Sequence, residues 1–313
     1  MARISIVTPT FQQAGTIRET IDSVLGQDHA DLEYWVLDAG SRDGTVDILR
    51  SYEHDPRFHW LSEPDNGQSD AINKGLARCT GDIFNWINSD DYLEKGALKR
   101  VAEVFEKYPG TDIVSGRTAE FRGTPPIIFN QIHLQIRSSP EKTITVGVFC
   151  QPSTFWRTEV VRSLGGIDTP LHYVLDWDLW VRYLARYGQA KVQRIDELLA
   201  YFRHHDDAKT TAGSTKFYDE TKTVFQNLHL TLRAPESFLL PEAEGIPGWH
   251  RREFELGPKF SRSLYLGCYA ERMVRTHRRK NPALAKKWLH QTWRYKPWVT
   301  FWRIKMALRL LFR

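Results

Sequence analysis

The first hundred residues alternate between strand-like and helix-like patterns, and this alternation limits the possible folds more than any other feature. Short apolar runs such as "RISIVTPT", "FHWLSE" and "DIFNWIN" are typical of buried strands. Between them lie segments with apolar residues at helical spacing, for example "AGTIRETIDSVLGQ". Strands that alternate with helices form βαβ units. The pattern therefore predicts an α/β fold with a mainly parallel, Rossmann-like sheet flanked by helices.

Polar clusters follow four of these predicted strands. They lie at residues 8–10, 38–43, 63–67 and 88–91. In open α/β sheets the ligand binds outside the carboxyl ends of the strands, which all lie at one edge. The four clusters therefore predict one shared site.

The rest of the chain is less regular. Residues 110–200 include one helix-like segment, "YVLDWDLWVRYLARYG", and one strand that ends in a histidine-containing loop. After Thr210 the alternation disappears and the patterns are helical. We expect a first domain at 1–212, with one half at about 1–110 and the other at about 111–212. A helical region with a basic amphipathic tail is expected at 213–313.

Composition excludes several classes of protein. Of the 313 residues, 41% are hydrophobic and 26% are charged, which is typical of a soluble globular chain and unlike a disordered one. Three separated cysteines without a CxxC pair argue against a disulfide framework or a zinc site, and fit a reducing compartment. No signal peptide and no spanning helix are expected. These features predict a cytoplasmic protein.

Four motifs resemble a known family. The segments "IVTPTFQQAGT", "VLDAGSRDGT", "EPDNGQSDAIN…NWINSDD" and "DWDLWVR" are similar in order and spacing to family 2 glycosyltransferases, over roughly residues 4–206. The resemblance implies a GT-A fold and an inverting, metal-dependent enzyme of the EC 2.4 class. The resemblance makes 1–212 the catalytic domain, with the nucleotide-sugar half at about 1–110 and the acceptor half at about 111–212. The implied donor is a nucleoside-diphosphate sugar, with a UDP-sugar expected. The implied acceptor is a hydroxyl of a glycan or lipid-linked glycan in surface polysaccharide biosynthesis.

The first motifs supply candidate nucleotide-binding residues. A carboxylate at a strand end, such as Asp38, can accept hydrogen bonds from a base or ribose. The resemblance implies that Asp38 contacts the nucleoside, although Ala39 stands where the family often has a second aspartate. Thr8 and Pro9 would form the other wall of the base pocket, and Asp65 would join the nucleotide site. The alternative for both aspartates is helix or turn capping.

"FNWINSDDYLEKG" holds the candidate metal site. A divalent cation offsets the charge of a diphosphate, and Mg²⁺ or Mn²⁺ prefers carboxylate oxygens. The family's D-x-D signature falls on Asn88-Ser89-Asp90, so the first carboxylate is an amide here. We expect all three residues to bind the nucleotide sugar, Asp90 to be the main metal ligand and Asp91 a second. Alternatively, Asp91 caps a helix that begins near Glu94, and Asp90 is solvated.

A second element would complete the metal site. The resemblance implies an R-x-H element after the last strand, and its histidine would face the pyrophosphate or the metal. By spacing, that histidine is His205, two residues after Arg203. An independent metal site with Asp206 and Asp207 is the alternative.

The candidate catalytic base lies in "YVLDWDLWVR". A neutral hydroxyl is a poor nucleophile, so transfer needs a general base. The resemblance assigns this role to Asp176, whereas Asp178 is predicted to be structural. Helix capping is the alternative for both. Gly165, Gly166 and Trp177 are candidates for shaping the acceptor pocket.

The C-terminus carries a separate hypothesis. In "WVTFWRIKMALRLLFR", Lys305, Arg309 and Arg313 fall on one side of a helix and apolar side chains fall on the other. This pattern predicts a peripheral helix on the inner face of the cell membrane. Packing on the catalytic domain or in a dimer is the alternative, and self-association is left open. No nucleic-acid partner is expected, because the aromatic residues form one apolar face.

Two rival functions remain. A sugar nucleotidyltransferase would also handle nucleotide sugars with a metal, but "TPTFQQAGT" lacks the glycine-rich, basic phosphate loop of that class. A catalytically inactive glycan- or nucleotide-binding scaffold is favoured by Asn88. Against the scaffold stand Asp90, Asp176 and His205.

Overall fold

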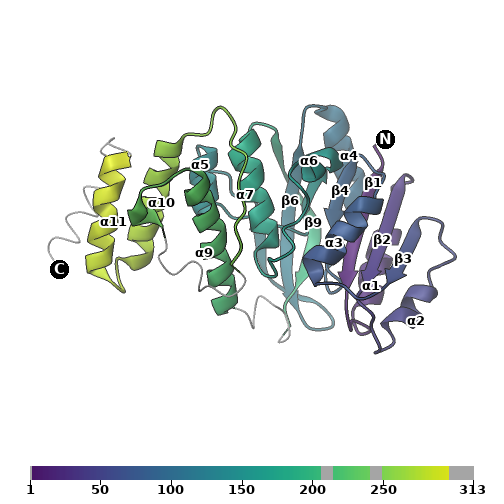
Figure 1. The fold of residues 1–313 in the computed structure, drawn as a ribbon. Coiled ribbons are helices and arrows are strands. Elements are labelled where there is room, and N and C mark those ends of the chain that lie inside the picture. The colour runs from purple at the N-terminus through teal and green to yellow at the C-terminus, as the bar shows by residue number, and fades with distance from the viewer. Residues whose placement is uncertain (1, 206–213, 240–248, 296–313) are drawn as a thin grey trace.

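The computed structural model describes residues 2–205, 214–239 and 249–295 (Figure 1). The tail segment from Trp298, for which a membrane helix is predicted, lies outside the described residues. No helix among the described residues is both long enough and apolar enough to cross a membrane.

Within the described residues, nine strands form one sheet in the order β3-β2-β1-β4-β8-β6-β9-β5, and β7 pairs with β6. The first four neighbours in this order are parallel, as the sequence predicts. Their bounds are β1 (Ile4–Thr10), β2 (Leu32–Asp38), β3 (Phe58–Ser62) and β4 (Ile83–Trp86).

Helices connect these parallel strands, as predicted, and cover both faces. Because side chains alternate along a strand, β1 sends Val7 into one hydrophobic core with α3 and Ile6 into another with α1 and α4. This explains why β1 is buried along its whole length. The bounds are α1 (Ile17–Leu25), α2 (Thr45–Arg50), α3 (Gln68–Arg78) and α4 (Ala97–Lys107).

The second half of the sheet is mixed, whereas the sequence predicts a mainly parallel sheet. β8 runs antiparallel to both β4 and β6, and β7 runs antiparallel to β6, while β9 is parallel to β6. Antiparallel neighbours need no crossover helix, so the chain can turn directly from β6 into β7. The elements are β5 (Tyr92–Leu93), β6 (Ile113–Arg122), β7 (Ile127–His133), α5 (Pro140–Val146), β8 (Thr154–Arg157), α6 (Thr158–Ser163) and β9 (Val192–Arg203).

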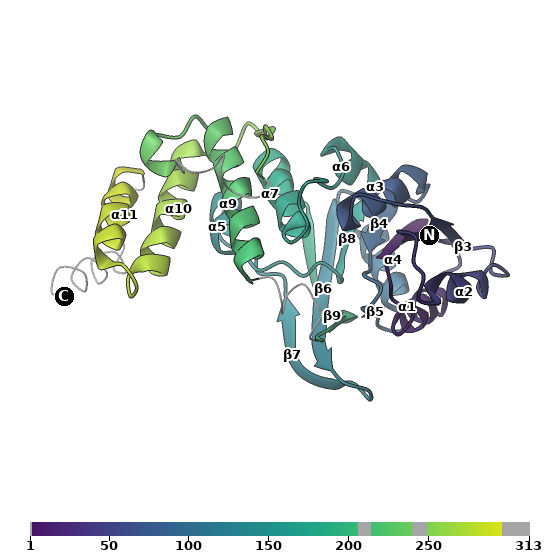
Figure 2. The same ribbon diagram turned by 60° about the horizontal axis from the view of Figure 1, so that its bottom comes forward.

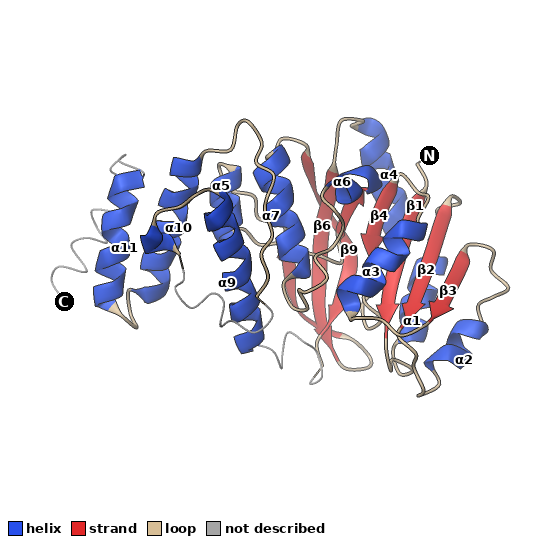
Figure 3. Ribbon diagram, in the orientation of Figure 1, coloured by secondary structure: helices blue, strands red, loops and turns tan. Residues whose placement is uncertain are grey.

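The remaining helices extend the molecule beyond the sheet (Figure 3). They are α7 (Leu175–Tyr187), α9 (Ser214–Thr231), α10 (Arg262–His277) and α11 (Pro282–Tyr295), with a short 3-10 helix at Glu236–Phe238. One hydrophobic core runs from the sheet through all four helices. The predicted domain boundary at 212 stays a prediction, and the core is shared across it.

Two contacts fix α9 against the start of α7. The Glu220 carboxylate accepts hydrogen bonds from the backbone N–H groups of His172, Tyr173 and Val174, at 2.7 to 3.0 Å. The Trp177 ring packs edge-on against the Phe225 ring, with 4.9 Å between the ring centroids. The start of α7 is therefore held from the side of the helical region.

Candidate functional site

The carboxyl ends of the parallel strands meet at one edge of the sheet, the lower edge in Figure 1. β9 ends at the same edge, because His205, two residues beyond it, contacts Asp90 after β4. The polar clusters predicted to form one site therefore lie along a common edge, which is called the carboxyl edge below.

Asp38 ends β2 and is only 2% exposed. Its carboxylate accepts hydrogen bonds from the backbone N–H groups of Gly40 and Ser41, and from the hydroxyls of Ser41 and Ser62. A carboxylate has room for about four such donors, so Asp38 is fully occupied within the protein. It fixes the loop that borders the site. Its contact with a nucleoside stays a prediction, and a bound nucleoside would have to replace one of these donors.

Thr8 and Pro9 lie inside the sheet. Thr8 has no exposed surface, and its Oγ1 lies 2.9 Å from the hydroxyl of Tyr34. At the end of the same strand, Phe11 is 55% exposed.

Asp65 shapes the turn that enters α3. Its Oδ1 accepts the backbone N–H of Gly67 at 2.8 Å, and Gly67 has a φ of 102°, which favours glycine. The N-cap is Gly67 and no side chain caps the helix, so Asp65 caps the turn before α3, and the alternative that it caps the helix itself is wrong. Nearby, Lys74 pairs with Glu63 at 3.0 Å and behaves as an ordinary surface lysine.

Asn88 and Asp91 turn towards the protein. The Asn88 Oδ1 accepts from the Gln68 side chain at 2.7 Å, and its Nδ2 donates to Asp91 at 3.3 Å. Asp91 is 1% exposed and accepts the backbone N–H of Arg203 at 2.9 Å. Burial, and then the charge of Asp90, raise the pKa of the Asp91 carboxyl well above its usual range. The alternative that Asp91 caps the next helix is wrong, because α4 begins after Gly96 without a side-chain cap.

Asp90 and His205 form the exposed part of the predicted metal site. The Nε2 of His205 lies 2.9 Å from Oδ2 of Asp90, and both side chains remain partly exposed. Arg203 secures the pair: its Nε donates to the backbone carbonyl of Asp90 at 2.9 Å, and its guanidinium pairs with Glu19 of α1. In the described part of the chain, no three acidic, histidine or cysteine side chains gather as a metal cluster. Two of the three predicted ligands therefore meet, and Asp91 turns away. Buried Ser89 lies between Asn88 and Asp90.

Asp176 lies in the first turn of α7 and is partly exposed. No side chain caps this helix, so the capping alternative for Asp176 is wrong. Burial raises the pKa of the Asp176 carboxyl, although the backbone N–H groups of residues 176 and 177 oppose the shift. A raised pKa makes a carboxylate a better proton acceptor.

Two observations place the start of α7 beside the carboxyl edge. A Cβ built on Gly67 would lie 3.1 Å from Nδ1 of His172, so the strap before α7 passes against the start of α3. Burial, and then the charges of Asp176 and Glu120, raise the pKa of the Cys150 thiol to about 12. Asp176 therefore lies close to the loop between α5 and β8, which contains Cys150.

Asp178 has the structural role that the sequence predicts. It is 1% exposed, and its Oδ2 accepts from Nε of Arg182 at 2.7 Å. Arg182 is 4% exposed and also donates to the carbonyl of Leu164. Trp177 packs towards α9, and its acceptor role stays a prediction.

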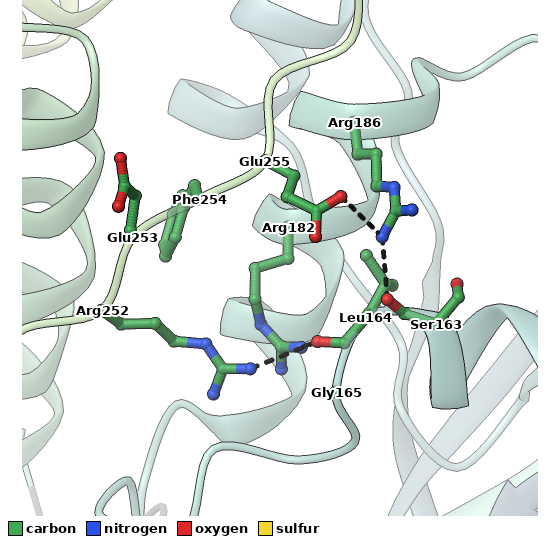
Figure 4. Close-up of a pocket in the computed structure, with 9 residues that line it drawn as sticks. All are labelled: Ser163, Leu164, Gly165, Arg182, Arg186, Arg252, Glu253, Phe254 and Glu255. Carbon is green, nitrogen blue, oxygen red and sulfur yellow. Dashed lines mark hydrogen bonds and ion pairs between the residues drawn. The ribbon is translucent and has the colours of Figure 1, made fainter.

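Gly165 and Gly166 are not brought to the carboxyl edge. Both have a positive φ, and a Cβ on Gly166 would lie 2.5 Å from Oδ1 of Asn73, in the middle of α3. Gly165 lines a separate pocket of about 210 Å³ (Figure 4). That pocket is built around paired charges, among them Arg186 with Glu255 at 2.9 Å. It joins α6 and α7 to residues 252–255.

Comparison with known proteins agrees with this architecture. Residues 5–165 match the family model of glycosyl transferase family 2. An uncharacterized glycosyltransferase of Nostoc sp. is 25% identical over 231 residues, which are 65% of this chain and 65% of the relative. The chondroitin synthase of Escherichia coli is 24% identical over 180 residues, 57% of this chain and 26% of that protein.

Solved structures show a similar fold. S. aureus TarS 1–349 in complex with UDP has a TM-score of 0.62 at 15% identity, over 99% of this chain and 88% of that one. The mannosyltransferase PcManGT from Pyrobaculum calidifontis, in complex with GDP-Man and Mn²⁺, has a TM-score of 0.50 at 18% identity, over 99% and 87%.

The matched family model covers half of the chain. The chain belongs to glycosyl transferase family 2. Its fold is of the GT-A type with additional C-terminal helices.

Proposed function

We propose that this glycosyltransferase inverts the anomeric centre as it transfers a sugar from a nucleoside-diphosphate sugar to a hydroxyl of a glycan or lipid-linked glycan. The observation that carries the proposal is the arrangement of Asp176, with its raised pKa, beside an edge that also holds the Asp90–His205 pair. The structural neighbours crystallised with UDP and with GDP-Man support this class of donor. The chondroitin synthase relative supports a role in polysaccharide synthesis.

In the proposed reaction Asp176 is the general base. Its carboxylate accepts the proton of the acceptor hydroxyl while that oxygen forms a bond to the anomeric carbon. On the opposite side, the bond from the anomeric carbon to the diphosphate breaks, and the nucleoside diphosphate leaves with the electron pair. The position of Asp176 in the first turn of α7 keeps the carboxylate oriented by backbone N–H groups.

The donor set at the carboxyl edge fits a divalent cation. One carboxylate and one imidazole face each other at Asp90 and His205, and both have exposed surface for a ligand. Asp90 and His205 would hold Mn²⁺ or Mg²⁺, and the Asn88 amide borders the pair. When bound, the cation supplies positive charge that stabilises the leaving diphosphate. Asp91 would become a ligand only if it gave up its hydrogen bond from Arg203.

A screen of nucleotide sugars tests the proposal directly. We expect one UDP-sugar or other nucleoside-diphosphate sugar to raise the melting temperature of the full chain, and Mn²⁺ to increase that shift. Incubation with the same donor and Mn²⁺ should release a nucleoside diphosphate. Release of pyrophosphate would instead indicate a nucleotidyltransferase. If no donor bound and no donor were hydrolysed, the scaffold alternative would replace the proposal.

Substituting Asp90 should weaken the effect of Mn²⁺ on nucleotide binding. We expect Asp90→Asn to weaken Mn²⁺-dependent binding of UDP by roughly tenfold or more, because the partly exposed carboxylate of the pair is lost. Isothermal titration with UDP, with and without Mn²⁺, measures this change. Asp47→Asn is the matched control, since it makes the same carboxylate-to-amide change at an exposed aspartate that pairs with Arg50 on α2. Equal Mn²⁺ dependence in Asp90→Asn and the wild type would contradict the assignment.

The pH profile should report the Asp176 carboxyl. Asp176 can accept a proton only when ionised, and burial raises its pKa above the usual aspartate value of about 4. We therefore expect kcat/KM to fall as the pH is lowered through this raised pKa, at a higher pH than an ordinary aspartate would give. Circular dichroism at each pH checks that the fold is retained. A profile that stays flat down to the ordinary aspartate range would argue against Asp176 as the base.

A further inference from the structure

The β6–β7 hairpin extends from the sheet as a projecting ribbon (Figure 2). Every residue from 122 to 131 is exposed, although the tip contains a run of large apolar side chains. Ile127, Ile128 and Phe129 are 69%, 47% and 50% exposed. Soluble proteins seldom present consecutive large apolar residues without a partner, so this tip is a candidate interaction surface.

The apolar side chains lie on both faces of the ribbon. Neighbouring residues on a strand point to opposite faces, so Ile127 and Ile128 do so here. Ile127 pairs with exposed Arg122 on β6, and Ile128 pairs with buried Phe121. The Arg122 guanidinium lies 4.9 Å from the Phe129 ring centroid, which places Phe129 on the Ile127 face.

This two-faced exposure narrows the choice of partner. A flat protein surface, or a second copy paired along the edge strand, would cover one face or the edge of the ribbon and leave the other face in water. A lipid layer surrounds an inserted hairpin and covers both faces at once. The geometry therefore favours a bilayer over a protein partner.

A basic turn faces the same side of the molecule. Arg262, at the start of α10, donates to the carbonyl of Leu232 just after α9, and Ser263 donates to the carbonyl of Tyr295 at the end of α11. The turn between α10 and α11 therefore lies at the opposite end of these helices. Figures 1 and 2 both show it on the side towards which the hairpin projects.

The turn has the charge that an anionic surface would attract. It contains Arg278, Arg279 and Lys280, of which the last two are exposed. From residue 272 to 295 the sequence has no aspartate or glutamate to offset these bases. Each base near an anionic membrane contributes about 1 kcal/mol, which corresponds to roughly a fivefold change in binding.

We propose that the hairpin tip and the basic turn together form a docking surface for an anionic lipid bilayer. Ile127, Ile128 and Phe129 enter the boundary between headgroups and acyl chains, and the basic turn binds the headgroups. The carboxyl edge lies on the same side, so docking would bring this edge to the membrane. The inference uses neither the chemistry proposed above nor the tail beyond residue 295.

Co-sedimentation of the full chain with vesicles tests the surface. Two vesicle types are needed, one of phosphatidylcholine alone and one with phosphatidylglycerol added. We expect the wild type to bind the anionic vesicles, and the triple variant I127S/I128S/F129S to bind them roughly tenfold less well. The double variant R279Q/K280Q should lose roughly 25-fold on anionic vesicles, about fivefold for each base, and little on neutral ones.

Matched controls come from the opposite side of the sheet. Tyr108 is 44% exposed just after α4, and Tyr108→Ser should bind as the wild type does. Arg78→Gln/Lys107→Gln removes two exposed bases from the ends of α3 and α4, and it tests whether net charge alone explains the loss. Thermal melting confirms that each variant is folded.

Three results would overturn the proposal. The first is a wild type that stays in the supernatant with both vesicle types. The second is a folded triple variant that sediments as the wild type does. The third is a triple variant that changes a dimer into a monomer in analytical ultracentrifugation, with vesicle binding unchanged. The third result would assign the hairpin to contact between two copies of this chain.

Discussion

Asp176→Asn is expected to lower the transfer rate by about a thousandfold, while donor binding stays close to that of the wild type. A positioned general base contributes roughly 10²- to 10⁴-fold, and asparagine keeps the shape of the side chain but cannot accept the proton. Asp176 is partly exposed and makes no ion pair with the other residues that the structure describes, so replacing its carboxylate should cost little stability. Single-turnover transfer and nucleotide titration, measured side by side, separate chemistry from binding.

Asp47→Asn is the matched control for this experiment. Asp47 also lies in the first turn of a helix, α2, but it is exposed and pairs with Arg50 at 2.9 Å. The substitution Asp47→Asn should leave the transfer rate unchanged. If Asp176→Asn transferred sugar at the wild-type rate, Asp176 would have no part in the mechanism. If the variant lost donor binding together with transfer, Asp176 would belong to the donor site instead.

Asp178→Asn, two residues further along α7, should act on stability instead. It removes one partner of a buried ion pair and leaves the Arg182 charge without its carboxylate. Burial raises the pKa of Asp178 and lowers that of Arg182, so desolvation disfavours both charged forms. Such a pair adds little net stability, yet removing one partner costs about 3–5 kcal/mol. Urea unfolding followed by circular dichroism measures this change in the free energy of unfolding.

The exposed pair of Asp47 with Arg50 again supplies the control. Its side chains are 80% and 61% exposed, and water screens their attraction. Asp47→Asn should therefore change the free energy of unfolding by at most about 1 kcal/mol. If Asp178→Asn and Asp47→Asn lowered the free energy of unfolding by similar amounts, burial would not explain the destabilisation expected at Asp178.

The first half of the fold was predictable because each element carries its own pattern. β1, β2, β3 and β4 are short apolar runs, and the helices between them have a clear apolar face. Periodicity of this kind is local, so a single sequence reveals it. The common edge then followed from the geometry of parallel strands.

The second half of the fold was harder to predict from the sequence, because its strands pair with strands that lie far away along the chain. Strand β6 pairs with three different strands, and β8 joins β4 to β6 in the antiparallel sense. Nothing in the short run Thr154–Arg157 specifies those partners. The site residues show the same limit. The sequence placed Asp90 and Asp91 side by side, but only the tertiary contact of Asp91 with Arg203 turned that carboxylate inward.

Glu220 has a consequence for how such a protein could change during evolution. Its carboxylate satisfies three backbone donors at the approach to the helix that carries Asp176, although it belongs to a helix that follows the last strand of the sheet. A C-terminal region exchanged by recombination would have to bring an equivalent acceptor to the same place. The helices after the sheet are therefore not a freely replaceable module, because part of the support for the proposed base is encoded in them.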